Sequence, residues 1–134
     1  MPFEIVNPKS LSTPRGFSHG MLAPAGGRLL FVAGQAGWTQ GSGDPDGFEA
    51  QFARALDQVL TVVREAGGEH ADVARLTVYV TDLEAYRRSL KALGETWRAR
   101  FGTHYPAMAL LEVKGLVDEG AVVEIEATAV IGGR

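Results

Sequence analysis

Apolar residues recur at intervals of three and four along two stretches of the chain, which is the spacing of a helix that buries one face. In the first stretch these residues are Phe48, Phe52, Leu56, Val59, Val63 and Ala66. In the second they are Tyr86, Leu90, Leu93, Trp97 and Phe101. Asp46 or Gly47 can cap the start of the first stretch and Gly67-Gly68 its end, while Asp82 and Gly102 bound the second. We expect two amphipathic helices, over about 48–66 and 83–101.

Alternating or continuous apolar segments predict the strands of a sheet. The apolar run that ends at Gly34 follows Ala25-Gly26-Gly27, residues that permit a tight turn, so we expect residues 17–23 and 28–34 to form a hairpin. Further strands are expected at 3–6, 75–81, 107–114 and 121–131. The order β-β-β-α-β-α-β-β predicts an α+β domain with a mixed six-stranded sheet and both helices on one face.

The last two predicted strands each have an apolar side and a mixed side. The residues of one parity are all apolar and suit packing against helices: Ala107, Ala109, Leu111, Val113, Val123, Ile125, Ala127 and Ala129. The alternate residues combine apolar and charged side chains: Met108, Leu110, Glu112, Lys114, Val122, Glu124, Glu126 and Thr128. Because the mixed side is too apolar for open solvent and too acidic for a dry core, we expect a subunit interface that contains a cleft.

Length and composition limit the class of protein. With 134 residues, 46% of them apolar and 22% charged, residues 1–134 are expected to form one domain with its own core. The absence of cysteine excludes disulfides, thiolate nucleophiles and cysteine-ligated metals. The 13 basic and 16 acidic residues give a net charge of -3 without a basic run, so we expect no nucleic-acid partner. No apolar run has transmembrane length and no signal sequence is evident, so we expect a cytoplasmic protein with no membrane partner.

Three carboxylates are the first candidates for chemistry. Glu124 and Glu126 are two residues apart on one strand, and Glu112 is expected to lie across from them. Carboxylates that share a site can supply the acid and the base of a hydrolytic reaction. On spacing alone, the same residues also fit a solvated strand face or salt bridges between subunits.

Histidines and a glycine-rich segment offer weaker signals. His19 and His104 can shuttle protons, but their positions also suit an exposed and a helix-terminal histidine, and the spacing of the three histidines predicts no metal site. Gly34 would let backbone N–H groups approach a ligand, and Trp38 would cover it. That segment lacks the spacing of a nucleotide-binding loop and also fits a plain strand-to-loop turn, so we expect no cofactor.

Six segments occur in a specific order along nearly the whole chain: RGFSHG, LLFVAGQAGW, QFARALDQVLTVVREAGG, ADVARLTVYVTDLEAYR, YPAMALLEV and VVEIEATAV. Together they resemble the Rid family, the YjgF-like reactive intermediate deaminases. The resemblance implies a chorismate-mutase-like fold and a homotrimer with small-molecule ligand clefts between subunits. It also agrees with the mixed strand side inferred above.

The resemblance assigns roles to several residues. Glu124 stands at the position of the family carboxylate that orients or activates the hydrolytic water. Gly34 matches the glycine whose backbone contacts the ligand, and Phe17 matches an aromatic residue that closes the cleft. Ser18, beside Phe17, is a weaker candidate for the same cleft.

The chain departs from the deaminating branch of the family, which hydrolyses 2-enamine and 2-imine acids such as 2-aminoacrylate to 2-keto acids and ammonia. Where that branch has an arginine, a cysteine and an asparagine in the cleft, this chain has Met108, Leu110 and Leu90. Methionine cannot form the charged two-pronged contact by which arginine holds a carboxylate. We therefore predict a divergent member whose cleft has no evident anion receptor and favours a neutral or cationic ligand.

Two functions from different classes remain open at this stage. The first is a divergent hydrolase in which Glu124 activates water for attack on an imine, an enamine or a carbamate. The second is a binding or regulatory trimer that keeps the fold and the cleft without catalysis. A third, endoribonuclease or translation-inhibitor activity, is disfavoured by the acidic charge and the lack of a basic patch.

Overall fold

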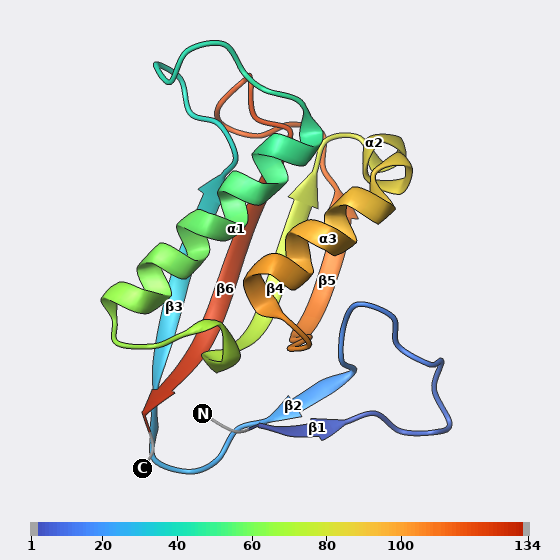
Figure 1. The fold of residues 1–134 in the computed structure, drawn as a ribbon, viewed down its shortest axis with the longest axis vertical. Helices are drawn as coiled ribbons and strands as arrows, with labels where there is room; N and C mark the ends of the chain where they lie inside the picture. Colours follow the sequence, from blue (N-terminus) through green and yellow to red (C-terminus); the bar gives the residue numbers. More distant parts are fainter. Residues whose placement is uncertain (1–2, 133–134) are drawn as a thin grey trace.

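A four-stranded mixed sheet is the centre of the α+β fold in the computed structural model, which describes residues 3–132 (Figure 1). Its strand order is β3-β6-β4-β5. β6 lies antiparallel between β3 and β4, whereas β4 and β5 are parallel. The strands are β3 Gly27–Ala36, β4 Val73–Val80, β5 Ala107–Glu112 and β6 Val123–Gly132.

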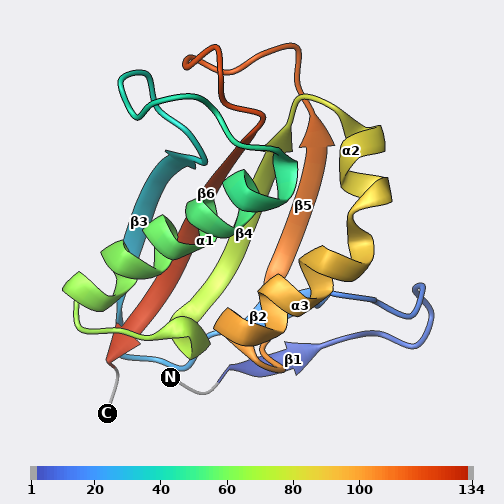
Figure 2. The same ribbon diagram turned by 45° about the horizontal axis from the view of Figure 1, so that its top comes forward.

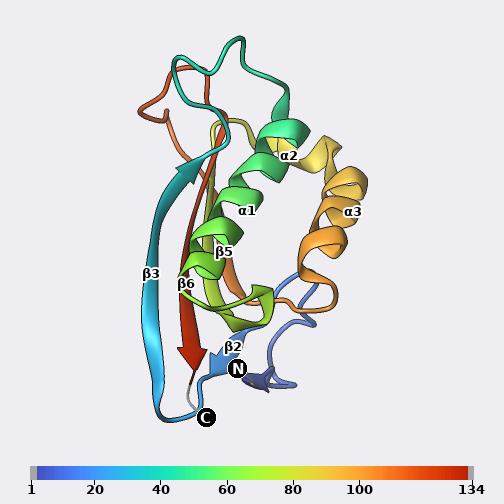
Figure 3. The ribbon, with the colours of Figure 1, turned by 60° about the vertical axis from the view of Figure 1, so that its left-hand side comes forward.

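Both long helices cover the same face of this sheet, as predicted (Figure 3). The helical elements are α1 Phe48–Glu65, the 3-10 turn η1 His70–Asp72, α2 Leu83–Arg88 and α3 Leu90–Phe101. The apolar stripe of α1 packs on the sheet through the fully buried Leu56, Val59 and Val63. Burial of this stripe supplies most of the drive for the helix to form. The opposite face of the sheet, called here the open face, carries no helix.

The predicted pairing of residues 17–23 with 28–34 is wrong. β2 (Gly20–Leu22) pairs with β1 (Glu4–Val6), and β3 pairs with β6 instead. The six strands therefore form a four-stranded and a two-stranded sheet rather than one six-stranded sheet (Figure 2).

Long-range hydrogen bonds explain this change. The Ser18 N–H donates to the Pro106 carbonyl at 3.0 Å, and its hydroxyl donates to the Tyr105 carbonyl at 2.6 Å. Ser18 also forms an isolated parallel bridge with Ala107. These contacts fasten the segment before β2 to the beginning of β5, so the local turn signal at Ala25-Gly26-Gly27 does not decide its pairing.

The second predicted helix is divided at Ser89. The Ser89 hydroxyl donates to the Ala85 carbonyl at 2.8 Å, and its N–H bonds to the Tyr86 carbonyl three residues back. Serine side chains that bond the backbone in this way compete with the regular helical pattern. Two helices, α2 and α3, therefore replace the single helix expected over 83–101.

The side of β5 that faces the helices is opposite to the predicted one. Parallel pairing with β4 places Met108 beside Leu76 and Leu110 beside Val78, and both β4 residues are buried in the core. The larger side chains fill the space between β5 and the helices, because register with β4 fixes which parity faces them. The prediction for β6 is confirmed, with Val123, Ile125, Ala127 and Ala129 buried.

The expected group of three carboxylates is also wrong. Glu112 lies at the end of β5, and its Oε1 accepts the Leu83 N–H at 3.0 Å, at the start of α2. A carboxylate here satisfies one of the free N–H groups at a helix N-terminus. Only Glu124 and Glu126 are left together, on the open face.

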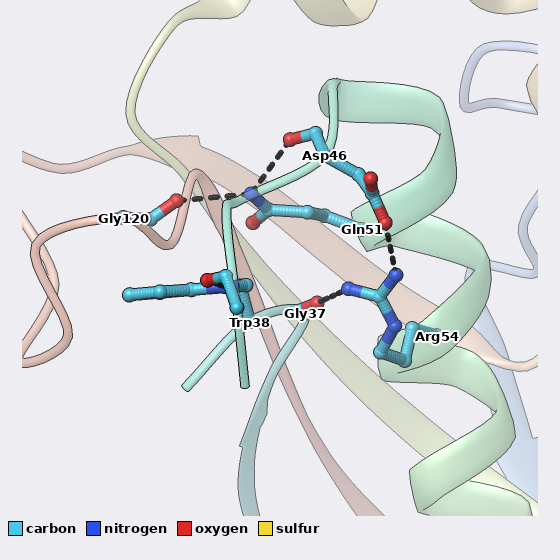
Figure 4. Close-up of polar contacts among 7 residues, drawn as sticks. Gly37, Trp38, Asp46, Gln51, Arg54 and Gly120 are labelled. Atoms are coloured by element: carbon cyan, nitrogen blue, oxygen red, sulfur yellow. Dashed lines mark hydrogen bonds and ion pairs between the residues drawn. The ribbon is translucent and has the colours of Figure 1, made fainter. Parts of the chain in front are cut away.

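Gln51 joins the loops at one end of the sheet (Figure 4). This fully buried side chain donates from Nε2 to the Asp46 and Gly120 carbonyls, both at 2.9 Å, and its Oε1 accepts the Val122 N–H at 2.9 Å. Arg54, one turn along α1, pairs with Asp46 and donates to the Gly37 carbonyl. The start of α1, the end of β3 and the approach to β6 are thereby held together.

Candidate functional site

The residues expected to form one ligand site lie in two groups on opposite faces of the sheet. Glu124 and Gly34 meet on the open face, whereas Leu90, Met108 and Leu110 line a cavity on the helix side. A single chain therefore does not bring the candidate catalytic carboxylate to the apolar part of the site.

The cavity on the helix side has a volume of about 290 Å³. Its apolar walls come from α3 and β5 and include Leu90, Leu93, Trp97, Met108 and Leu110. The predicted grouping of Leu90, Met108 and Leu110 is thus found in the structure. The interior is predominantly apolar, as is usual for small-molecule sites.

Aromatic rings form one wall of this cavity. The Trp97 ring stacks on Phe101 with a centroid distance of 4.2 Å, and it lies nearly parallel to Tyr105 at 6.1 Å. The indole N–H donates to the His104 carbonyl at 3.2 Å. The wall is therefore rigid and flat, with its polar atom already satisfied.

Two cationic side chains also line the cavity. Arg15 comes from the N-terminal segment that Ser18 fastens to β5, and Arg98 comes from α3. Both are exposed, so they lie at the mouth rather than in the apolar interior. Long-range packing thus places two arginines at the mouth of the cavity that contains Met108, while the expectation of a cleft without an anion receptor stays a prediction.

Glu124 and Gly34 are in close contact on the open face. A register shift in β3 between Val32 and Gln35 places Gly34 against β6. A Cβ atom at position 34 would lie 2.9 Å from the Glu124 Cδ, closer than real Cβ contacts. The Glu124 side chain therefore occupies the space that a larger residue at position 34 would need, and its carboxylate has no hydrogen-bond or ion-pair partner among residues 3–132.

Comparisons with known proteins agree with this architecture. The profile of the family described as Endoribonuclease L-PSP matches residues 8–131. The chain superposes on the Rid-family protein YyfB of Yersinia pestis with a TM-score of 0.83 and 30% identity, covering 98% of this chain and 100% of that one. This chain belongs to the Rid (YjgF-like) family.

Other relatives have a known ligand or activity. The goat 2-iminobutanoate/2-iminopropanoate deaminase is 30% identical over 107 residues, which are 78% of this chain and 74% of the goat protein. Escherichia coli TdcF, solved with bound serine, has a TM-score of 0.68 and 25% identity, with 91% of each chain covered. The alignments with these two Rid relatives cover most of the present chain.

The remaining expected site residues of this Rid chain have structural partners. Phe17 packs edge-to-face on His19 with a centroid distance of 5.3 Å, and among the described residues 3–132 it is not one of those that line the cavity. Ser18 is occupied by its bonds to the start of β5.

In the range 3–132 no group of three histidine, aspartate or glutamate side chains is arranged to hold a metal ion. Within the same range, no helix is both long and apolar enough to span a bilayer.

Tyr79 and Glu126 form a pair beside Glu124 on the open face. The Tyr79 hydroxyl donates to Glu126 Oε2 at 3.2 Å. Burial raises the pKa of Tyr79, and the hydrogen bond and the negative charges of Glu126 and Glu124 raise it further. The phenol therefore stays neutral at physiological pH and keeps Glu126 engaged, which distinguishes it from Glu124.

His104 is a half-buried histidine that contacts the beginning of β4. Its Nε2 lies 2.7 Å from the Val73 carbonyl, and burial lowers the pKa of this histidine. Because the unfolded chain then binds a proton at a higher pH than the folded chain, stability falls as the pH decreases below the unfolded value of about 6.5.

We expect the free energy of unfolding, measured by urea titration, to decrease between about pH 7.5 and 5.5. His104→Gln should make this decrease smaller, since it removes the group that is neutral in the folded chain. His19→Gln, at a half-buried histidine away from Val73, serves as the control for replacing a histidine elsewhere in the chain. An identical pH dependence in His104→Gln and the wild type would contradict this role.

Proposed function

We propose that this Rid chain forms a homotrimer that hydrolyses an imine or enamine in clefts between its subunits. The observation that carries the proposal is the unpartnered Glu124 carboxylate against Gly34, on the face opposite the cavity. A neighbouring subunit that covers the open face of one chain would bring its own cavity toward that carboxylate.

The open face has the character of a surface that a second subunit covers. Leu29 is 63% exposed and Phe31 is 74% exposed, and both lie on β3, an edge strand of the main sheet. Next to Phe31, a groove of about 250 Å³ also contains Arg75, Thr77, Glu126 and Thr128. Apolar side chains rimmed by polar ones are typical of subunit interfaces.

In the proposed reaction, Glu124 takes a proton from water while the water oxygen bonds to the imine carbon. That proton is returned to the imine nitrogen, which gives a neutral carbinolamine. Glu124 then moves the carbinolamine hydroxyl proton to the amino nitrogen, the C–N bond breaks, ammonia leaves and a carbonyl product remains. An enamine enters the same route after a proton shift to the imine. A positioned carboxylate that accepts and returns one proton in each step is sufficient for this sequence.

The relatives support the class of reaction and ligand. The goat protein is a deaminase of 2-iminobutanoate and 2-iminopropanoate, and TdcF holds serine. A small nitrogen-containing compound related to an amino acid is therefore the ligand class that we propose. The cytoplasmic location and the absence of a nucleic-acid partner stay predictions.

A non-catalytic ligand-binding trimer is the second candidate. It is favoured by the apolar side chains at positions 90, 108 and 110, which give the cavity a binding surface without a reactive group. Ammonia release measured with a panel of imines and enamines separates the two candidates, because a hydrolase releases ammonia from at least one of them and a binding protein from none.

We expect ammonia release from 2-aminoacrylate at least about tenfold slower than from an arginine-bearing relative, because Met108 cannot pair with its small carboxylate. Met108→Arg should raise kcat/KM for this substrate, and Met108→Leu is the size-matched control. Turnover by the wild type equal to that of the relative would contradict the argument from Met108.

A further inference from the structure

We propose that the cavity between α3 and β5 binds a carboxylic acid with a bulky, ring-bearing apolar group, and that Arg98 and Arg15 hold the carboxylate at its mouth. This proposal names the substrate class of the proposed function. The reaction of that substrate rests on the proposed function, whereas binding of the acid does not. The reacting compound would be a 2-imino acid that gives a 2-oxo acid and ammonia.

The position of Arg98 is supported by a glycine inside α3. A Cβ atom at Gly94 would lie 3.2 Å from Nη1 and 3.7 Å from Nη2 of Arg98. The guanidinium therefore lies back along the helix over Gly94, and both residues line the cavity. Glycine is a poor residue for a helix interior, and at position 94 its missing side chain leaves room for the Arg98 guanidinium.

The charges around the cavity are uncompensated. Among the described residues, three arginines away from the cavity are paired: Arg54 with Asp46, Arg87 with Glu84 and Arg100 with Asp57. Arg98 and Arg15 have no side-chain hydrogen bond or ion pair within residues 3–132, and no aspartate or glutamate lines the cavity. In a chain of net charge -3, a cavity with two free guanidinium groups complements an anion.

The size and shape of the cavity select the rest of the ligand. A volume of about 290 Å³ exceeds the roughly 150 Å³ that accommodates benzene in an apolar protein cavity. The parallel rings of Trp97 and Tyr105 offer a flat wall against which another ring can pack. A three-carbon acid would leave most of this apolar surface uncovered, and it would not extend from the aromatic wall to the mouth.

Binding of unreactive acids tests the proposal without requiring turnover. In isothermal titration calorimetry with the full chain, 3-phenylpropanoate should bind at least tenfold more tightly than 3-phenylpropanamide, which has the same ring but no charge. Propanoate, which has the charge but no ring, should bind at least tenfold more weakly than 3-phenylpropanoate.

Variants assign the effect to the arginines. Arg98→Gln and Arg15→Gln should each weaken 3-phenylpropanoate binding at least several-fold and leave 3-phenylpropanamide binding unchanged, and Arg98→Lys should restore part of the loss. Arg64→Gln, at an exposed arginine in the last turn of α1, is the matched control and should bind like the wild type.

Two results would overturn the proposal: equal affinity for the acid and the amide, or unchanged acid binding in both Arg98→Gln and Arg15→Gln. Because 3-phenylpropanoate does not react, its binding is measured without turnover, and a failure of the hydrolytic proposal would leave this binding intact. Conversely, loss of acid discrimination with retained imine hydrolysis would refute only the substrate class.

Discussion

Gln51→Leu is expected to lower the free energy of unfolding by about 3 kcal/mol, because three backbone groups lose their hydrogen bond to this fully buried side chain and each bond contributes about 1 kcal/mol. The groups are the carbonyls of Asp46 and Gly120 and the N–H of Val122. Leucine has a similar volume, so the loss reflects the hydrogen bonds rather than a void. Thermal unfolding should show a decrease of about 10 °C in Tm.

Gln58→Leu is the matched control for this prediction, since it makes the same substitution two turns further along α1 at a half-buried side chain that has no hydrogen bond within residues 3–132. It should change Tm by only a few degrees. If Gln51→Leu were as stable as Gln58→Leu, the loops at this end of the sheet would not depend on the Gln51 contacts.

Glu124→Gln is expected to abolish hydrolysis while the fold and the assembly remain intact. Glutamine preserves the size of the side chain but cannot accept the proton of water, and a general base contributes about 10²–10⁴-fold to the rate. The measurement is kcat/KM for ammonia release, together with Tm and the mass in solution.

Glu126→Gln is the control for Glu124→Gln because it changes a carboxylate on the same strand face that already accepts the Tyr79 hydroxyl. Its effect on kcat/KM should be much smaller. Full activity in Glu124→Gln would remove this residue from the mechanism.

The sequence predicts the parts of the fold that depend on local periodicity. The bounds of α1 and the buried side of β6 follow from residues such as Leu56 and Ile125, whose spacing alone sets the face they share. The buried parity of β5 does not follow in this way, because both of its faces carry apolar side chains and the register with Leu76 and Val78 decides between them.

The candidate site could be predicted only in part, because packing between distant segments decides which side chains line the cavity. The contact of Gly34 with Glu124 and the clustering of Met108 with Leu90 agree with positions assigned by family resemblance. Arg98 resembles any surface arginine in the sequence, and only packing shows that its guanidinium lies over Gly94 at the cavity. Arg15 reaches the same cavity through a pairing of Ser18 with β5 that no local signal predicts.

The central claim is that each active cleft combines the cavity of one subunit with Glu124 of its neighbour. Leu90→Trp fills the cavity, and Glu124→Gln removes the base, so each variant alone should be inactive. When the two variants are co-expressed in equal amounts and assemble at random, a cleft is intact if its cavity comes from a Glu124→Gln chain and its carboxylate from a Leu90→Trp chain. About one cleft in four meets this condition. We predict that the mixed protein regains about a quarter of the wild-type rate of ammonia release, whereas a mixture as inactive as either parent would contradict a cleft shared between subunits.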